Sequence, residues 1–431
     1  MIKHRLTQLG PRLTKRKFIQ SSLLAALIPL QFGSKAKDKT MEQRISTLIA
    51  EYSSQGIHRT GTEVDHRSAD WLIAKISALG VEATETAFGF QRLQPLECSL
   101  RLGQLTVPGV PLYDCSYTEE KGFSGSLGPI GSQADIGVAM APPFANTEIG
   151  QAIHSARLTD AHRGIIIVSE ASQPKNGIAL LNAEHFSKPF GPPVLQVAGK
   201  HWREIQLAIA SSTPGHLTLH AETIDAIARN IGATIEGKNR QLPPLVIMTP
   251  RSGWWQCASE RGGGIACFLE MMRAIKASEP QRDVIFTANT GHELGHIGLD
   301  HYLDTHAALV QDALLWIHLG ANFAARYDPG VRLQYSDEAA RSRLRPWLEK
   351  NAIEPDAETP TGERPLGEAR NIFDGGGRYL SILGRNGLFH HPDDLWPDAV
   401  NPRETTKWIN AFVALGVELA GSAEQPHSEL N

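Results

Sequence analysis

Thiols are scarce in this chain, and their scarcity excludes several kinds of site. The 431 residues include four cysteines, at positions 98, 115, 257 and 267. No two of them form a Cys-x-x-Cys pair, so a metal site built from thiolates is not expected. The sequence leaves open one disulfide between Cys98 and Cys115, whereas Cys257 and Cys267 are typical of buried free thiols.

Strong charge of one sign is lacking as well. The formal net charge is −4, charged residues make up 20% of the chain, and no basic stripe runs along it. Binding of nucleic acid is therefore not expected. The chain also lacks low-complexity segments and repeats of fixed period. Its length exceeds what one hydrophobic core usually holds, so we expect a large domain with an insert or a second domain.

The N-terminal segment differs in composition from the rest. Its first 17 residues contain several lysines and arginines and no acidic residue, and Ser21–Phe32 is apolar but too short to span a bilayer comfortably. Thr14–Gln20 resembles a twin-arginine signal in which lysine replaces the first arginine. We expect residues 1–36 to be an export signal and the protein to be periplasmic or extracellular; an uncleaved anchor is the alternative. No integral membrane span is expected in the mature chain.

Three regions with different patterns follow. Residues 37–100 begin with helical spacing, which is clear in Asp65–Gly80. Residues 101–222 contain more glycine, proline and short apolar runs, which indicates a smaller inserted α/β or β-rich domain. Residues 223–425 alternate strands and helices, and residues 426–431 form a tail. In the third region the expected strands are Ile231–Ile235, Leu245–Met248, Val284–Ala288, Ala313–Ile317 and Tyr379–Leu383, and the expected helices are Gly264–Ile275 and Thr406–Leu419.

Short apolar strands between helices are typical of an α/β fold with a mixed, largely parallel sheet flanked by helices. Ligands of such sheets bind beyond the carboxyl ends of the strands. Polar clusters follow the expected strands at this edge: Thr249–Arg261, His292–His296, His318–Asn322 and His390–Asp394. The site is therefore expected there.

Arg282–His301 supports two incompatible interpretations. The first is a helical His-Glu-x-x-His zinc motif at His292, Glu293 and His296, because i, i+4 spacing places both histidines on one helix face. The second is a buried strand that runs into a glycine-rich loop presenting Glu293. Three glycines lie in or beside the supposed helix, at positions 291, 295 and 298. Each costs about 1 kcal/mol in a helix interior, which favours the strand and loop. Surface histidines near a glycine turn are a third possibility.

Several segments, in their order, resemble the zinc aminopeptidase family that includes glutamate carboxypeptidase and glutaminyl cyclase. Asn230–Gly237 resembles the entry strand of that family, Leu245–Ser252 its next strand, and Cys257–Glu270 its metal-bridging loop and helix. Val284–Gly298 resembles its Glu-Glu segment and Phe389–Val400 its closing His-x-x-x-Asp segment. The middle region resembles a protease-associated domain. The resemblance covers nearly all of the chain after residue 36 and implies a zinc aminopeptidase-like fold.

The family's metal ligands are only partly retained. Its first histidine corresponds to Thr249, the aspartate that supports this histidine to Arg251, its bridging aspartate to Glu260, and its general base to His292. A further aspartate falls near His318, at Ile317 or Gly320. Glu293 and His390 match family ligands. The resemblance therefore implies at most one zinc, held by Glu260, Glu293 and His390.

Other residues receive roles around this expected site. We expect His292 to act as a base, although it could also be a ligand, and Asp394 to orient His390. Arg251 is expected to pair with Glu260 or Glu293 in place of the missing cation, or to receive a substrate carboxylate. Trp254 either lines the cleft or packs against the following helix.

The leading functional hypothesis is an exported metallopeptidase-like hydrolase, an aminopeptidase or related amide-bond hydrolase acting on a peptide or small amide. The alternatives are an inactive pseudoenzyme that binds a peptide or protein through the cleft, and a His-Glu-x-x-His endopeptidase.

Overall fold

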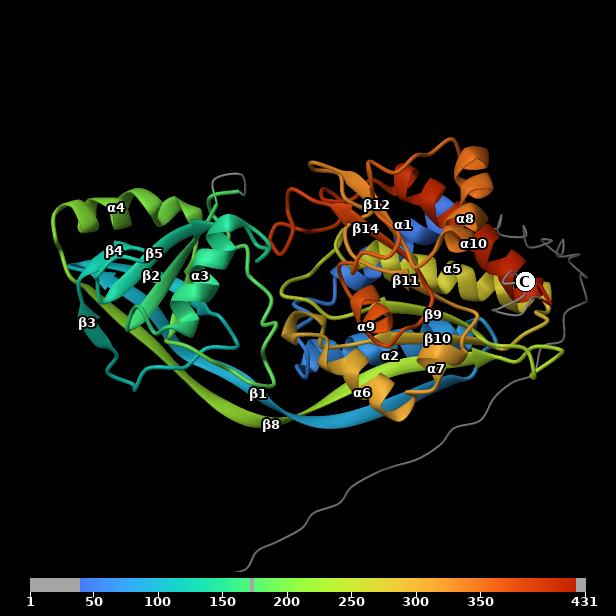
Figure 1. Cartoon of the computed structure of the whole chain (residues 1–431), viewed down its shortest axis with the longest axis horizontal. Helices are drawn as coiled ribbons and strands as arrows, with labels where there is room; N and C mark the ends of the chain where they lie inside the picture. The colour runs from blue at the N-terminus through green and yellow to red at the C-terminus, as the bar shows by residue number, and fades with distance from the viewer. Residues whose placement is uncertain (1–38, 171–173, 424–431) are drawn as a thin grey trace, which may run out of the picture. The chain divides into compact units, whose positions relative to one another are not determined.

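The computed structural model describes residues 39–170 and 174–423 (Figure 1). The expected export signal, residues 1–36, and the tail, residues 426–431, lie outside the described residues. The strands are β1 (Ala83–Leu102), β2 (Leu105–Pro111), β3 (Phe123–Gly125), β4 (Leu127–Pro129), β5 (Ile136–Ala141), β6 (Gly164–Ser169), β7 (Val194–Val197), β8 (Gly215–Ile235), β9 (Leu245–Pro250), β10 (Val284–Asn289), β11 (Leu315–Leu319), β12 (Gly330–Tyr335), β13 (Ala357–Thr359) and β14 (Tyr379–Arg385). The α-helices are α1 (Met41–Ser53), α2 (Glu63–Ala78), α3 (Glu148–Leu158), α4 (Trp202–Ala210), α5 (Gly262–Ser278), α6 (Ile297–Thr305), α7 (Leu309–Asp312), α8 (Glu338–Asn351), α9 (Ala369–Asp374) and α10 (Pro402–Gly421), and two short 3₁₀ helices are η1 (Gly199–His201) and η2 (His292–Leu294).

The centre of the sheet is parallel and buried on both faces. β9 pairs in parallel with both β10 and β11, and β11 pairs in parallel with β14. Alternate residues of β9 enter different cores. Leu245 and Ile247 pack with α1, α5, α8 and α10, whereas Val246 and Met248 pack with α6, α7 and α9. Helices thus cover both faces, which explains why these strands are continuous apolar runs. The α/β fold expected from the sequence is confirmed, with each expected strand of residues 223–425 present.

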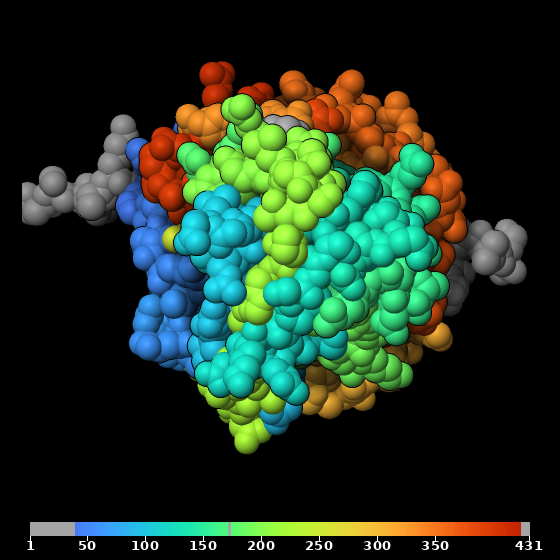
Figure 2. Space-filling model, turned by 90° about the vertical axis from the view of Figure 1, so that its left-hand side faces the viewer, coloured from blue at the N-terminus to red at the C-terminus, as the bar shows by residue number. Residues whose placement is uncertain are grey.

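The long antiparallel pair β1 and β8 links this sheet to a second core. The two strands pair from Ala83 and Ala233 at one end to Leu102 and Gly215 at the other and run side by side in Figure 1. On one side of this pair, β8 is hydrogen-bonded to β10. On the other side, β1 is hydrogen-bonded to β2, and the parallel strands β7, β6, β5 and β4 follow in the sheet. Residues between Leu100 and Leu219 form a hydrophobic cluster of their own. Figure 2 shows the face formed largely by this middle region, in cyan to green. Its exact boundaries and its likeness to a protease-associated domain stay predictions.

Two further expectations can be compared with the structure. Cys98 and Cys115 are free thiols, as are Cys257 and Cys267, so the disulfide left open by the sequence is not formed. Of the helices in the described ranges, none has the length and apolar character needed to cross a membrane.

Candidate functional site

The carboxyl ends of the central strands bring the expected polar segments together. The segment after β9 contacts the loop after β10, where the Ser252 hydroxyl donates to Glu293 Oε2 at 2.7 Å. It also meets the segment after β14, where His390 Nε2 lies 3.4 Å from Glu260 Oε1. Parallel strands end at the same edge of a sheet, so residues far apart in sequence converge there.

The Glu293 turn is a loop and contains no continuous helix. His292–Leu294 form a single 3₁₀ turn, and both flanking glycines are left-handed, with φ of 80° at Gly291 and 73° at Gly295. His296 is also left-handed, with φ of 71°, and α6 begins only after it. The strand-to-loop prediction is confirmed, and the helical His-Glu-x-x-His interpretation is wrong. The cause is the two glycines, which adopt a conformation that an α-helix cannot contain.

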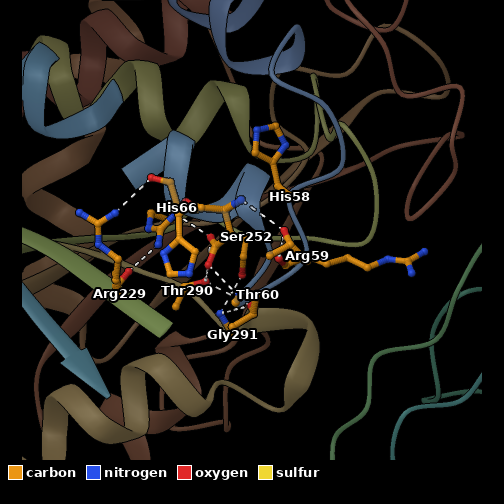
Figure 3. A network of polar contacts seen from close by, with 12 residues as sticks. His58, Arg59, Thr60, His66, Arg229, Ser252, Thr290 and Gly291 are labelled. Atoms are coloured by element: carbon orange, nitrogen blue, oxygen red, sulfur yellow. Dashed lines mark hydrogen bonds and ion pairs between the residues drawn. The ribbon is translucent and has the colours of Figure 1, made fainter. Parts of the chain in front are cut away.

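Hydrogen bonds already occupy the Glu293 carboxylate. Oε1 accepts from the backbone N–H and the hydroxyl of Thr60, at 2.8 and 2.7 Å, and Oε2 accepts from Ser252. In Figure 3, Thr60, Ser252 and Gly291 point toward one another around this turn. Burial raises the pKa of Glu293, and the bonds from Ser252 and Thr60 oppose that rise. The carboxylate therefore acts as the acceptor at the centre of a local network.

Glu260 faces a buried guanidinium that the sequence reasoning did not consider. Arg261 Nη2 lies 2.8 Å from Glu260 Oε1, and the two side chains are 0% and 1% exposed. Arg261 Nε donates to the Ser252 carbonyl at 2.7 Å, which fixes the guanidinium beneath the site. Glu260, Arg261 and His390 thus form a buried group in which the protein supplies the cation. Both oxygens of Glu260, both Nη atoms of Arg261 and Nε2 of His390 have no hydrogen-bond partner among the described residues.

His390 is oriented by a backbone carbonyl and not by Asp394. Its Nδ1 donates to the carbonyl of Leu180 at 2.6 Å, which leaves Nε2 directed toward Glu260. Asp394 accepts from Ser259 N–H, Ser259 hydroxyl and Glu260 N–H, at 2.8, 2.7 and 2.9 Å. Burial raises the pKa of Asp394 to about 7. Asp394 positions the turn before α5, so its expected role toward His390 is not what the structure shows.

Four more buried titratable side chains surround this group: His292, His296, His318 and Glu368. His292 Nδ1 lies 3.2 Å from Glu368 Oε1, and the rings of His292 and His296 stack with centroids 4.8 Å apart. Burial raises the pKa of Glu368 to about 8, while the charge of Arg261 opposes this. Burial, assisted by Arg261, lowers the pKa of His318 to about 3 and that of His292 well below its usual value. These histidines are therefore neutral near pH 7, and the positive charge of Arg261 contributes to the lowered pKa of both His292 and His318.

Arg251 lies in a different network. Its Nη1 donates to the side chain and carbonyl of Asp65, at 2.7 and 3.0 Å, and Nη2 donates to the Arg229 carbonyl. The Thr290 hydroxyl donates to the same Asp65 carboxylate at 3.1 Å. Figure 3 shows Arg229 and Thr290 in this network. The expectation that Arg251 pairs with Glu260 or Glu293 is wrong, because Asp65 of α2 approaches closely enough to neutralise it.

A cavity of about 750 Å³ opens above the buried group. His292, His296 and His390 line it on one side, and Leu181 and Asn182 of the middle region line another part. Phe144 and Leu366 at its rim are 46% and 48% exposed. Trp254 does not line this cavity. It is 1% exposed, donates through Nε1 to Asn182 Oδ1 at 3.0 Å and faces a second, smaller cavity.

The residues present do not fit the expected zinc centre. No group of three or more His, Cys, Asp and Glu side chains is disposed to hold a metal ion within residues 39–170 and 174–423. Of the predicted ligands, Glu260 and His390 are adjacent, but Glu293 is held by Thr60 and Ser252 and does not complete a set with them. A guanidinium beside Glu260 further disfavours a dication at this position.

The comparisons with known proteins agree with this fold. Residues 246–355 match the profile of peptidase family M28. A zinc aminopeptidase from Bacillus subtilis superposes with a TM-score of 0.73 at 16% identity, over 89% of this chain and 96% of that one. A peptidase M28 precursor from Shewanella amazonensis gives 0.70 at 17% identity, over 89% and 96%. An aminopeptidase from an Aneurinibacillus strain gives 0.64 at 13% identity, over 90% and 96%. No curated protein sequence matches the chain.

These matches show the fold. The chain has the fold of the zinc aminopeptidases, as the sequence resemblance predicted. Arg261 and Thr60 are site residues that the sequence patterns did not identify. A signal for Arg261 was present, since it follows Glu260 directly at the start of α5.

Proposed function

We propose that this protein is a metallopeptidase-like protein whose central site carries a guanidinium in place of metal, and that it binds a peptide or small amide in the cleft without zinc-dependent hydrolysis. The observation that carries the proposal is Arg261, fully buried and 2.8 Å from Glu260. The lack of a three-ligand group among the described side chains supports it.

Electrostatics favour the guanidinium over an added metal ion. Two unit charges about 4 Å apart interact by about 4 kcal/mol at an effective dielectric constant near 20, and a dication would double the repulsion. Arginine stays protonated throughout the physiological range, so it cannot relieve this repulsion by losing a proton. A zinc ion would need to displace Arg261 from Glu260 and from the Ser252 carbonyl.

The cleft that would hold the ligand has apolar and polar walls. Leu181, Leu366 and Phe389 supply apolar surface, and Asn182, Asn322 and Asn386 supply amides. Apolar surface with a few fixed polar groups is typical of sites that bind small organic ligands. The zinc aminopeptidase from Bacillus subtilis has the same fold, and its name supports peptides as the ligand class.

A hydrolase that holds one zinc is the second candidate. His390 donates through Nδ1 to a backbone carbonyl and leaves Nε2 free to accept, which is the arrangement of many metal-bound histidines. His292 beside Glu368 could then act as a base toward water. This candidate requires Glu293 to exchange its Thr60 and Ser252 partners for the metal.

Metal content of the purified, folded protein tests the proposal. We expect well below one zinc per chain after dialysis against dilute zinc, and about one would support the hydrolase. An Arg261→Gln variant removes the charge and should bind zinc more tightly than the wild type by calorimetric titration. Arg273→Gln, on an exposed part of the same helix, is the matched control. Equal zinc affinity in Arg261→Gln and the wild type would contradict the role of Arg261.

We also propose that residues 1–36 direct export, on the basic and apolar pattern of the sequence. A fusion of this segment to a reporter that matures only after export should be exported. Replacing Arg16 by Gln should reduce export if the twin-arginine-like motif is used, and unchanged export would contradict that route.

A further inference from the structure

A second cavity, of about 340 Å³, lies on the other side of the Glu293 turn. Two arginines from different elements line it. Arg59 precedes α2, and Arg92 lies on β1. Tyr113, Phe186 and Trp254 supply aromatic walls. The two arginines do not line the central cleft, so the inference does not rest on the proposed function.

The two arginines have no carboxylate partner in the described part of the chain. Arg59 donates to the Trp254 carbonyl at 3.2 Å and to the Tyr113 hydroxyl at 3.0 Å, both uncharged. Its guanidinium also lies 5.3 Å from the centroid of the Trp255 ring. The buried Nε of Arg92 has no hydrogen-bond partner. In Figure 3 the Arg59 side chain extends away from the network around Thr60 and Ser252.

The two carboxylates of the cavity wall are already paired elsewhere. Glu63 accepts from Arg67 at 2.6 Å. Glu293 accepts from Thr60 and Ser252. The wall therefore presents two positive charges with unused donors, one carboxylate that is paired with Arg67, and the Glu293 carboxylate, whose oxygens already accept bonds from Thr60 and Ser252. Guanidinium groups in such a setting favour an oxyanion, because charge-assisted bonds to a carboxylate are stronger than bonds to neutral acceptors.

We propose that this cavity binds a carboxylate attached to an apolar or aromatic body, such as the C-terminal residue of a peptide. Arg59 and Arg92 would bind the carboxylate, and Tyr113, Phe186 and Trp254 would pack against the body. The volume suits about one or two residues and is too large for an inorganic anion alone. Arg59 is held in place by the Tyr113 hydroxyl and the aromatic rings, so little side-chain entropy is lost on binding.

Titration of the full chain with N-acetyl-phenylalanine tests this site. Trp254 forms part of the wall, so binding should change tryptophan fluorescence, and calorimetry gives the affinity. N-acetyl-phenylalaninamide has the same body without the charge and should bind at least tenfold more weakly. Inorganic phosphate supplies charge without a body and should also bind more weakly. Equal binding of acid and amide, stronger binding of phosphate, or no binding of the acid would overturn the proposal.

Variants locate the site. Arg59→Gln and Arg92→Gln should each weaken binding of the acid by tenfold or more, with little effect on binding of the amide. Arg101→Gln, on the exposed part of β1, is the matched control and should bind as the wild type does. Arg370 lines the central cleft, so Arg370→Gln should also leave binding unchanged. If Arg59→Gln fails to fold, Tyr113→Phe keeps the ring, removes the hydroxyl that Arg59 contacts, and should still weaken binding. Loss of binding in Arg370→Gln with none in the arginine variants of the second cavity would refute the assignment.

Discussion

Replacing Arg261 by alanine should destabilise the protein strongly. The side chain is fully buried beside Glu260, and its Nε donates to the Ser252 carbonyl. Burial raises the pKa of nearby Glu368 to about 8, and the charge of Arg261 opposes that rise. The substitution would leave Glu260 without a cation, in a place where water is excluded.

The expected cost follows from this geometry. Removal of one partner from a buried ion pair costs about 3–5 kcal/mol, because the remaining charge has lost its solvation without compensation. The lost bond to the Ser252 carbonyl adds about 1 kcal/mol. The free energy of unfolding of a typical domain is about 5–15 kcal/mol, so the change is a large fraction of it.

Urea unfolding followed by tryptophan fluorescence measures the change. Arg273→Ala, which removes a half-exposed arginine from the same helix, should cost well under 1 kcal/mol and serves as the control. Adding Glu260→Gln to Arg261→Ala should recover part of the stability, because it removes the uncompensated charge. A cost below about 1 kcal/mol for Arg261→Ala would refute the view that Arg261 is the cation of the site.

Three further predictions concern buried charge and backbone. Burial lowers the pKa of His58 from 6.5 to about 3. Its contribution to stability is therefore complete above pH 6.5 and is lost as pH falls toward 3, by about 5 kcal/mol. His58→Phe should flatten that part of the stability profile in urea unfolding, and an unchanged slope would contradict the pKa shift. Asp65→Ala leaves Arg251 buried and unpaired and should cost about 3–5 kcal/mol in the same assay, whereas a near-neutral effect would rule out the pair. Gly295→Ala should lower the melting temperature more than Gly103→Ala. Both glycines have positive φ, but of the two only Gly295 would place a Cβ against a backbone oxygen, at 2.8 Å. Equal melting temperatures for the two variants would contradict the expected clash at position 295.

Local patterns in the sequence were enough to predict the elements that carry the site. The apolar runs at Leu245–Met248 and Val284–Ala288 became β9 and β10, because their burial on both faces requires continuous hydrophobicity. Gly291 and Gly295 correctly indicated a loop, because left-handed backbone favours glycine. The order of segments was enough to predict the zinc aminopeptidase-like fold.

The partners of the charged side chains could not be predicted in this way. Asp65, which neutralises Arg251, lies 186 positions away, and Thr60, which binds Glu293, lies 233 positions away. Matching to a family pattern suggested instead that Arg251 would replace the missing cation, whereas Arg261 lies beside Glu260.

The sequence by itself determined the strands, the helices and the edge of the sheet at which polar residues gather, since these follow from hydrophobic spacing and local backbone preference. Only the tertiary structure decided which guanidinium meets which carboxylate, and therefore that the described residues form no three-ligand metal group. The physical reason is that a buried ion pair depends on distance and exclusion of water, and both arise from the approach of elements that are far apart along the chain.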